Sequence, residues 1–479
     1  MAVNGVASLE AVLHALEQGE RELVGHLREA VAIESVSNDP ERYPECVMMS
    51  KYLVERIQAL GGQAKARSDT GTTDGPGGSR VPVSPIILAT FGNDASKKTV
   101  CAYGHYDVMP AALSEGWDSP PFVLEETEEL FHGRGTSDDK GPTLCWLAVI
   151  DAYNKAGVEM PVNLKLCFEG REEAGSDGLE ELIGLEMRSE GFFHDVDFIV
   201  ISDSGSLGAK PCVTYGLRGI AEFEFSVSGP ADNLHSGVYG GVAREPMTDL
   251  IKVLSSLTDE KGNLDVPDLN AMVAPVSEEE RRLYEDIEFD PVAWAKASKI
   301  PGVNGEMTKE NVLMRKWRFP TLSVHGIKAS SDYKATCIPA TCTARFSIRT
   351  VPKMEPKAVE RAVEKHLKDA FDTLDSCNQF TIDDVLVSDC FLGDVNDNNY
   401  SAARRANKAV YGSEPEFIRE GGSVPIAISL ANITRKSVCL LPICGPADNI
   451  HGPNESMLKK NLFQGAKVMA AYLVEIASA

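Results

Sequence analysis

An apolar run that ends in a histidine and an aspartate constrains this chain more than any other feature. Residues 100–103 predict a short buried strand, and Gly104 allows the chain to turn immediately before His105. His105 is therefore a candidate metal ligand at a strand end. The carboxylate of Asp107, two residues further on, can accept the other ring N–H of His105 and fix its tautomer. A lone His-X-Asp is also common in ordinary loops, so this motif needs support from elsewhere in the chain.

A second motif, GRGTSDDKGP at 133–142, supplies a candidate bridging carboxylate. Asp138 precedes a helix that is expected to begin near Lys140, because Ser137 and Asp139 have the side chains of helix caps. A carboxylate held at such a position can bridge two cations.

Later strand-like runs also end in residue types that bind metals. One run leads to Glu172 and Glu173, the next leads to Asp203, and a run near the C-terminus leads to His451. Strand-like and helix-like segments alternate in this part of the sequence, which predicts a doubly wound α/β sheet. Ligands bind beyond the carboxyl ends of the strands in such sheets, so these residues should lie near His105.

Two imidazoles and three carboxylates form the predicted ligand set. The five residues are His105, Asp138, Glu173, Asp203 and His451. This set suits two divalent ions with Asp138 shared between them, and it accepts Zn²⁺ while tolerating Mn²⁺ or Co²⁺. Two dications less three carboxylates leave a charge of about +1, which favours a metal-bridged hydroxide as the nucleophile.

Glu172 is the candidate general base. Adjacent side chains at a turn can point in different directions, so Glu173 can face the metals while Glu172 faces the bridging water. Glu172 would then take the proton of the water and deliver it to a leaving amine. The alternative for this pair is a solvated acidic turn that caps the next helix, but the ligand types at the other strand ends favour the catalytic interpretation.

Polar residues in glycine-rich contexts are candidate substrate contacts. His235 in DNLHSGVYGG could donate to a developing oxyanion, and Arg349 in FSIR could clamp a carboxylate in bidentate fashion. Thr336, Gly422 and Ser423 could add hydrogen bonds. Each also has a structural alternative: a turn residue for His235, a surface strand charge for Arg349 and a helix N-cap for Ser423.

Length and composition indicate a globular protein of two domains. The 479 residues exceed one ordinary core, and 43% are hydrophobic and 25% charged. The formal net charge of -24 disfavours nucleic acid or anionic membrane partners, because phosphates would be repelled over most of the surface. The eleven cysteines are scattered without a CxxC pair, as expected of reduced thiols in a cytoplasmic protein, and we expect no signal peptide or membrane span.

The order of the predicted elements divides the chain into a catalytic domain and an insertion. We expect residues 1–212 and 389–479 to form a catalytic domain with an α/β, doubly wound mixed sheet. Residues 213–388 contain long strand-like runs that flank two helices, which predicts an inserted α+β domain of split β-α-β type. Residues 70–84 are rich in Gly, Pro, Asp and Ser, and they predict a surface loop.

At these motifs the chain resembles the carnosinase and cytosolic non-specific dipeptidase group of dinuclear zinc peptidases, which includes the fungal Cys-Gly dipeptidases. The resemblance covers nearly the whole chain, through GHYDVMPA, GRGTSDDKGP, GREEAGSDGLEEL, HSGVYGG, FSIRTVP and REGGSVPI. It implies two divalent metal ions per subunit, Zn or Mn, at the five ligand positions. It further implies catalytic carboxylates at Asp107 and Glu172 and substrate contacts at His235, Thr336, Arg349 and Ser423.

The resemblance also implies an assembly. In that group the inserted domain is a lid that dimerises, so a homodimer is expected, with His235 reaching into the active site of the partner subunit. A monomer should then be nearly inactive.

Some positions differ from the pattern of that group. Arg171 stands where Met is usual before the Glu pair, and residues 204–206 read Ser-Gly-Ser in place of Asn-Tyr-Trp. The segment GPADNIHGPNE is more like the wider clan of aminoacylases and desuccinylases.

Three functional hypotheses follow. The first is a metal-dependent hydrolase of dipeptides such as Cys-Gly, acting through the metal-bridged hydroxide with Glu172 as general base. The second is a deacylase of N-acyl amino acids or a carboxypeptidase from the same clan, which the motif differences motivate. The third, from a different class, is a non-catalytic metal-binding scaffold, and the presence of Glu172 beside the ligands argues against it.

Overall fold

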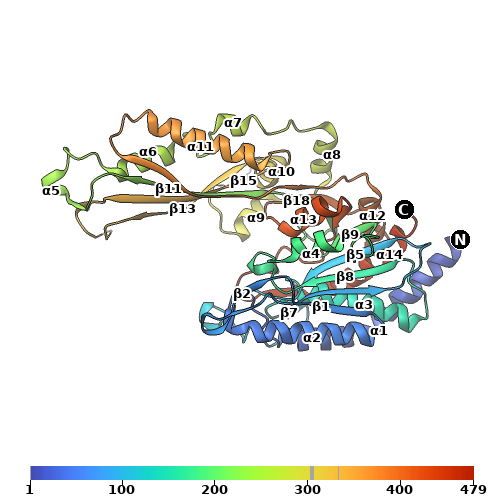
Figure 1. Ribbon diagram of the computed structural model, residues 1–479. Coiled ribbons are helices and arrows are strands. Elements are labelled where there is room, and N and C mark those ends of the chain that lie inside the picture. Colours follow the sequence, from blue (N-terminus) through green and yellow to red (C-terminus); the bar gives the residue numbers. More distant parts are fainter. Residues whose placement is uncertain (1, 303–306, 333) are drawn as a thin grey trace.

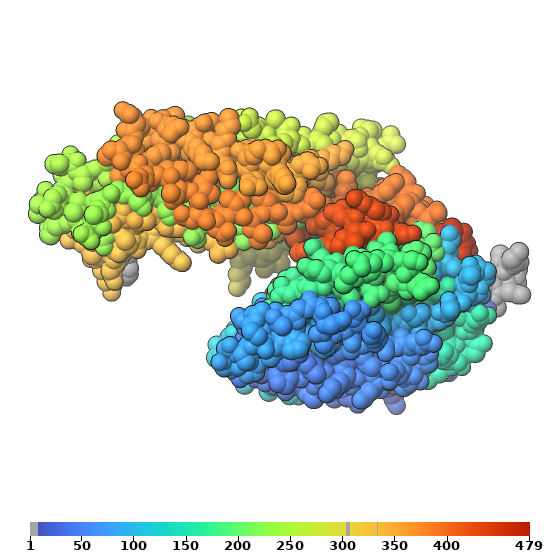
Figure 2. Space-filling view, viewed as in Figure 1, coloured from blue at the N-terminus to red at the C-terminus, as the bar shows by residue number. Residues whose placement is uncertain are grey.

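The computed structural model, which describes residues 2–302, 307–332 and 334–479, has a lower part and an upper part (Figure 1). Both ends of the chain build the lower part, and the middle of the chain builds the upper part, which we call the lid. The end of the lid that carries the short helix α5 (Ser236–Tyr239) overhangs the lower part without resting on it in the space-filling view (Figure 2).

One large mixed sheet forms the centre of the lower part. Its four central strands run parallel: β8 (Asn163–Glu169), β5 (Thr99–His105), β9 (Phe198–Ile201) and β19 (Ser437–Leu440). Almost all of their residues are buried, because helices cover both faces of the sheet. Antiparallel or peripheral strands complete the sheet: β1 (Gln63–Arg67), β4 (Ile86–Phe91), β10 (Cys212–Leu217), β17 (Phe391–Leu392) and β18 (Glu416–Glu420).

Helices pack on the two faces of this sheet as separate layers. One layer contains α1 (Ala2–Val31), α2 (Tyr43–Ala59), α3 (Lys140–Ala156), α12 (Asn398–Tyr411) and α14 (Lys459–Ile476). The opposite layer contains α4 (Leu179–Glu186) and α13 (Pro425–Thr434). In α1, Val12, Leu16, Leu23 and Leu27 recur at helical spacing and are buried, so one apolar stripe attaches the helix to the core. The predicted doubly wound α/β architecture is confirmed.

The lid is a four-stranded antiparallel sheet with helices on one face. Its strands, in spatial order, are β13 (Thr321–Ala329), β15 (Thr341–Thr350), β11 (Gly219–Ser228) and β16 (Gln379–Val387). The helices α6 (Pro246–Ser255), α7 (Pro267–Asn270) and α11 (Pro356–Asp372) lie above this sheet in Figure 1, away from the lower part. Alternate residues of β11, among them Phe223 and Phe225, are buried under these helices, so the other face of the sheet turns towards the lower part.

Shorter elements complete both parts of the molecule. The inserted segment also forms α8 (Glu278–Asp286), α9 (Pro291–Ala297) and α10 (Lys309–Trp317), of which α8 and α10 pack against β18 of the large sheet. In the lid, the pair β12 (Leu234–His235) and β14 (Cys337–Ile338) supports α5. In the lower part, a small three-stranded sheet contains β6 (Glu125–Glu126), β7 (Leu130–His132) and β20 (Ser456–Leu458).

Three local predictions need correction. Residues 70–84 are not only loop, because β2 (Thr72–Asp74) and β3 (Arg80–Pro82) pair as an antiparallel ribbon. Residues 213–217, assigned to the insertion, belong to β10 of the large sheet, where they pair with β18. Asp139 is the N-cap residue of α3, but its side chain makes no capping hydrogen bond, since it accepts the backbone N–H of His105 instead. The division into domains itself stays a prediction.

Within the described residues, no helix is both long enough and apolar enough to cross a membrane. All eleven cysteines are free thiols, and eight of them are buried.

Candidate metal centre

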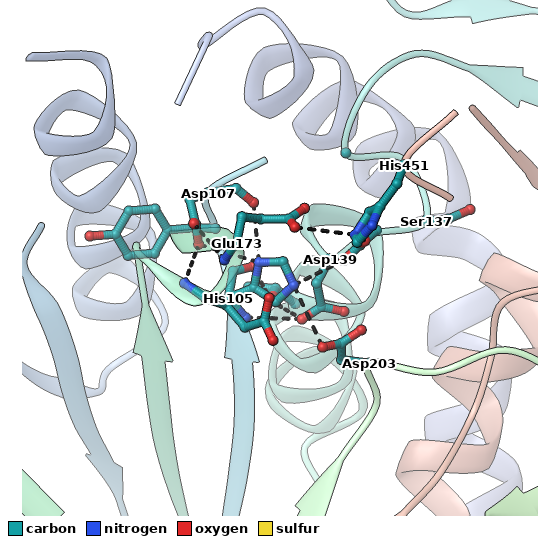
Figure 3. Close-up of polar contacts among 12 residues, drawn as sticks. His105, Asp107, Ser137, Asp139, Glu173, Asp203 and His451 are labelled. Carbon is teal, nitrogen blue, oxygen red and sulfur yellow. Dashed lines mark hydrogen bonds and ion pairs between the residues drawn. The ribbon is translucent and has the colours of Figure 1, made fainter. Parts of the chain in front are cut away.

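Asp138 contacts two of the residues that the sequence suggested as ligands, and the side chains of His105, Glu173, Asp203 and His451 converge on one place in Figure 3. Oδ1 of Asp138 lies 2.9 Å from Nε2 of His105, and its Oδ2 lies 2.9 Å from Nε2 of His451. The two oxygens of one carboxylate therefore face two different imidazoles. This is the geometry expected of a carboxylate shared between two cations.

Two groups of potential ligands share Asp138. The first consists of His105, Asp138 and Asp203, and the second consists of Asp138, Glu173 and His451. The donor atoms within each group lie within 4.8 Å of one another. Nε2 of His105 is 3.6 Å from Oδ2 of Asp203, and Nε2 of His451 is 3.1 Å from Oε2 of Glu173. The structure thus brings together all five predicted ligands, although their roles as ligands remain a proposal.

The parallel strands explain why residues so distant in sequence meet. His105 is the last residue of β5, Glu173 lies in the turn after β8, Asp203 follows β9, and His451 lies in the loop after β19. The carboxyl ends of these parallel strands lie at one edge of the sheet. Gly104 is required there, because a Cβ atom at this position would lie 2.5 Å from Oγ1 of Thr143.

Asp107 orients His105 and also fixes the turn that carries the two glutamates. Nδ1 of His105 lies 3.1 Å from the backbone carbonyl of Asp107 and 3.3 Å from its Oδ1, so both acceptors of this residue can set the ring tautomer. The two carboxylate oxygens of Asp107 accept the backbone N–H groups of Glu172 and Glu173, each at 3.1 Å, and the hydroxyl of Ser37 at 2.5 Å. The sequence suggested only the contact of this carboxylate with His105.

Glu455 organises the loop in front of Asp138, and its role was not anticipated from the sequence. Its buried carboxylate accepts the backbone N–H groups of Gly135, Ser137 and Asp138 at 2.9 to 3.2 Å. Nη1 of Arg134 pairs with the same carboxylate at 2.7 Å. Glu455 belongs to the motif that contains His451, so it ties the two ligand loops together. The motif GPNE could have pointed to it, but only the fold shows the backbone that it binds.

Burial and crowding of negative charge perturb the carboxyl groups of this site. Burial, reinforced by the charge of Asp138, raises the pKa of Asp203 to about 7. Burial, together with Asp203, Asp107 and Asp138, raises the pKa of Glu172 to about 9. Asp138 is the exception: burial opposes its ionisation, but hydrogen bonds from His105 and His451 hold its pKa well below the usual range.

The residues present fit a pair of divalent cations. Several carboxylates are withdrawn from water and repel one another, so the site is costly unless positive charge offsets them. Each ligand group combines imidazole nitrogen with carboxylate oxygen, the donor mixture that Zn²⁺ accepts. Asp107 supplies the outer carboxylate that a ligating histidine usually requires.

The predicted substrate contacts fall into two places. Nη1 of Arg349 on β15 donates to Oγ of Ser423 at 3.2 Å, so these two residues meet where the lid joins the lower part. His235 and Thr336 lie instead in the overhanging end of the lid, and both are exposed. Neither makes a hydrogen bond or ion pair to the five predicted ligands within the described part of the chain. Gly422, the remaining candidate, lies next to Ser423 in the turn before α13.

The positions that differ from the dipeptidase pattern have structural contacts of their own. Nε of Arg171 donates to Oδ2 of Asp177 at 2.8 Å, and its Nη1 donates to the carbonyl of Ser37 at 3.1 Å, which stabilises the turn before Glu172. The hydroxyl of Ser204, beside Asp203, is buried and has no protein partner.

Comparison with known proteins identifies a family that matches most of the chain. Residues 101–475 match the model of peptidase family M20/M25/M40. The chain is 40% identical to the Cys-Gly metallodipeptidase DUG1 of Saccharomyces cerevisiae over 477 residues, covering 97% of this chain and 98% of that protein. It is 40% identical to the human beta-Ala-His dipeptidase over 476 residues, covering 98% of this chain and 93% of that protein.

A solved structure agrees with these matches. The di-peptidase Dug1p of Saccharomyces cerevisiae superposes with a TM-score of 0.84 at 39% identity, covering 98% of this chain and 99% of that one. The similarity therefore extends over both the large sheet and the lid.

The first prediction tests the shared ligand. We expect Asp138→Asn to weaken the binding of both zinc ions, because its two oxygens face both histidines. Asp203→Asn and Glu173→Gln should each weaken mainly one ion, by about 10- to 100-fold or more. Equilibrium dialysis with zinc measures the stoichiometry and affinity, and Glu181→Gln on the exposed face of α4 is the matched control. Unchanged binding of two ions by Asp138→Asn would contradict the shared-ligand geometry.

The second prediction concerns pH. The pKa of His451 is raised, like that of Asp203. Hydrogen bonds to Asp138 and Glu173 raise the pKa of His451 to about 10. Both groups hold protons in the metal-free site near neutral pH, and a bound cation must displace them. Zinc affinity should therefore increase with pH, and binding at pH 7 should release about one proton or more, measured with an indicator dye in weak buffer. Zinc binding without proton release, at an affinity independent of pH, would show that these groups are not displaced.

Proposed function

Because the chain belongs to peptidase family M20/M25/M40, we propose that it is a metal-dependent dipeptidase that hydrolyses Cys-Gly or similarly short peptides. The observation that carries this proposal is the pair of ligand groups that share Asp138, with Glu172 beside them. Two relatives of 40% identity are named for the hydrolysis of the dipeptides Cys-Gly and beta-Ala-His, and the chain covers nearly all of each.

Two divalent ions, Zn or Mn, would be held by His105, Asp138 and Asp203 on one side and by Asp138, Glu173 and His451 on the other. When bound, such ions polarise a scissile carbonyl and make water a stronger acid. The charge of the ions also offsets the repulsion between the surrounding carboxylates. It therefore lowers the pKa of Glu172 from about 9 towards the range in which a carboxylate accepts a proton at neutral pH.

Glu172 is the proposed general base. Its neighbour Glu173 points to His451, while the backbone N–H of Glu172 is held by Asp107. This anchoring fixes where the free carboxylate of Glu172 lies, so it can take a proton from the attacking water and return it to the leaving amine. Asp107 supports the reaction by orienting both this turn and the ring of His105.

Arg349 and Ser423 are the proposed contacts for the carboxylate end of the substrate. Their mutual hydrogen bond places a guanidinium from the lid beside a hydroxyl of the lower part. Because the proposed substrate is a short peptide, we propose neither nucleic acid nor a membrane as a partner of the protein.

We also propose a homodimer, in which His235 and Thr336 act in the active site of the partner subunit. Both residues are exposed at the overhanging end of the lid, and Nδ1 of His235 accepts the N–H of Gly237, which leaves the other ring nitrogen available. β13 is an edge strand with partly exposed apolar side chains, Val324 at 48% and Ile327 at 41%. The eleven free cysteines further support a reducing, cytoplasmic location.

The third prediction tests the reaction and its substrate. Zinc-loaded protein should hydrolyse Cys-Gly and carnosine faster than N-acetyl amino acids. Glu172→Gln should lower kcat by about 10²- to 10⁴-fold because the base is lost, while zinc binding is retained. Glu181→Gln serves as the control, with kcat unchanged. Undiminished activity in Glu172→Gln would refute the mechanism.

A deacylase of N-acyl amino acids is the second candidate, favoured by one observation. Residues 204–206 beside Asp203 are Ser-Gly-Ser, so the two aromatic side chains of the dipeptidase pattern are absent next to this predicted ligand. Faster turnover of N-acetyl amino acids than of dipeptides in the same panel would establish this alternative.

The fourth prediction tests the shared active site. His235→Ala and Glu172→Ala subunits should each be inactive alone, because each lacks one required group. After random exchange of equal amounts, about half of the dimers are mixed and each contains one site with both groups intact, so about a quarter of the wild-type activity should return. Mass spectrometry of differently tagged subunits verifies the exchange. Complete exchange without recovery of activity would exclude a contribution of His235 across the interface.

A further inference from the structure

Arg218 occupies the single position between two sheets of the protein. β10 of the large sheet ends at Leu217, and β11 of the lid begins at Gly219. The side chain of Arg218 is half-buried at this junction. No part of the proposed mechanism uses it so far.

Two hydrogen bonds attach Arg218 to both parts of the molecule. Its Nε donates to the carbonyl of Gly421 at 3.1 Å, and its Nη1 donates to Oγ1 of Thr321 at 2.9 Å. The remaining N–H groups have no protein acceptor in the described part of the chain. A Cβ atom at residue 421 would lie only 2.9 Å from Nη2 of Arg218, so the glycine at this position leaves room for the guanidinium.

Arg349 lies close to the same place. Thr321 and Arg349 are directly opposite each other in the pairing of β13 with β15, so their side chains stand on the same face of the lid sheet. The neighbouring residue Ile348 is buried under the helices, and Arg349 therefore points to the open face, towards the lower part. Ser423 connects the pair, because its hydroxyl donates to the carbonyl of Arg218 at 2.6 Å and accepts from Arg349.

The two guanidinium groups lack a negative partner. No carboxylate in the described residues lies within 4 Å of either side chain, although each is about half withdrawn from water. Burial and the neighbouring charge of Arg349 lower the pKa of Arg218 to about 10. The acidic group that influences Arg349 is Glu222, which already pairs with Arg345 at 3.2 Å. The charge of Lys316 beside Arg218 is opposed by Glu420, whose carboxylate accepts the backbone N–H of Gly205. Cations in such positions are normally paired, so an external anion is the missing partner.

We propose that Arg218 is a second substrate-binding residue, which donates together with Arg349 to the terminal carboxylate of the peptide. This inference rests on the proposed function, in which Arg349 and Ser423 receive that carboxylate. Two guanidinium forks that converge on one carboxylate satisfy the free N–H groups of Arg218 and remove the repulsion between the arginines. Binding of a free carboxylate would also hold the lid to the lower part, because Arg218 contacts Gly421 in one and Thr321 in the other.

The proposed role of Arg218 is tested by measuring the binding of peptides rather than their hydrolysis. Zinc-loaded Glu172→Gln protein serves as the parent, and calorimetry measures its affinity for Ala-Gly and for Ala-Gly amide, which differ by one negative charge. The parent should prefer the acid. Arg218→Gln should reduce the acid-to-amide preference by roughly 10- to 100-fold, the usual effect of a lost charge-assisted hydrogen bond. Affinity for the amide should change little.

Two further variants separate substrate binding from a structural role at the junction. Arg218→Lys retains the charge but not the planar fork, so it should keep part of the preference even if Arg218→Gln folds poorly. Arg361→Gln, an exposed residue of α11 on the opposite face of the lid sheet, should leave the preference unchanged. Equal losses for acid and amide in both Arg218 variants, or no loss in either, would overturn the inference.

The experiment distinguishes failure of the Arg218 inference from failure of the proposed dipeptidase activity. A parent that binds acid and amide equally overturns the inference for Arg218 directly. Carboxylate-selective binding that depends on Arg218, combined with no hydrolysis of any dipeptide by the wild-type protein, would support the subsite and refute the proposed dipeptidase activity instead.

Discussion

The structure of the catalytic part depends on one carboxylate that faces two histidines. Asp138 can present one oxygen to His105 and the other to His451 only if the loop before α3 and the loop after β19 are held against each other. Glu455 provides this restraint, since its carboxylate binds three backbone N–H groups in the Asp138 loop. The polar interior of the site is costly in isolation, and divalent cations are the partners that make it stable.

The same principle applies at the junction of the lid with the lower part. Among the residues that the structure describes, Arg218 and Arg349 are half-buried positive charges without a carboxylate partner, just as the metal site gathers carboxylates without enough positive charge. The positive charge at the junction is complementary to the carboxylate of a short peptide. The negative charge of the metal site is complementary to divalent cations. The lid contributes the guanidinium of Arg349 and the lower part contributes the hydroxyl of Ser423 to the proposed carboxylate site.

Sequence patterns predicted most regular elements, because long buried strands and amphipathic helices have distinct periodicities. The strand-like run that leads to Asp203 is β9, and the long strand-like runs of the insertion are strands β11, β15 and β16 of the lid sheet. The ribbon of β2 and β3 was missed, since its Gly- and Pro-rich composition is typical of loops. The boundary between the two sheets after Leu217 was also missed, because β10 and β11 read as one continuous strand-like run in the sequence. Only the strand pairing shows that β10 belongs to the large sheet and β11 to the lid.

The sequence by itself determined the chemistry of the site. It supplied imidazoles and carboxylates at the ends of predicted parallel strands, and the common edge of such strands was enough to predict that they meet. Only the tertiary structure decided which oxygen of Asp138 faces which imidazole, that Glu455 binds the loop in front of it, and that Arg218 lies beside Arg349. Apart from the contact of Asp138 with His105, these relations join residues that are more than a hundred positions apart, and Glu455 acts through backbone N–H groups, so no local pattern of side chains encodes them.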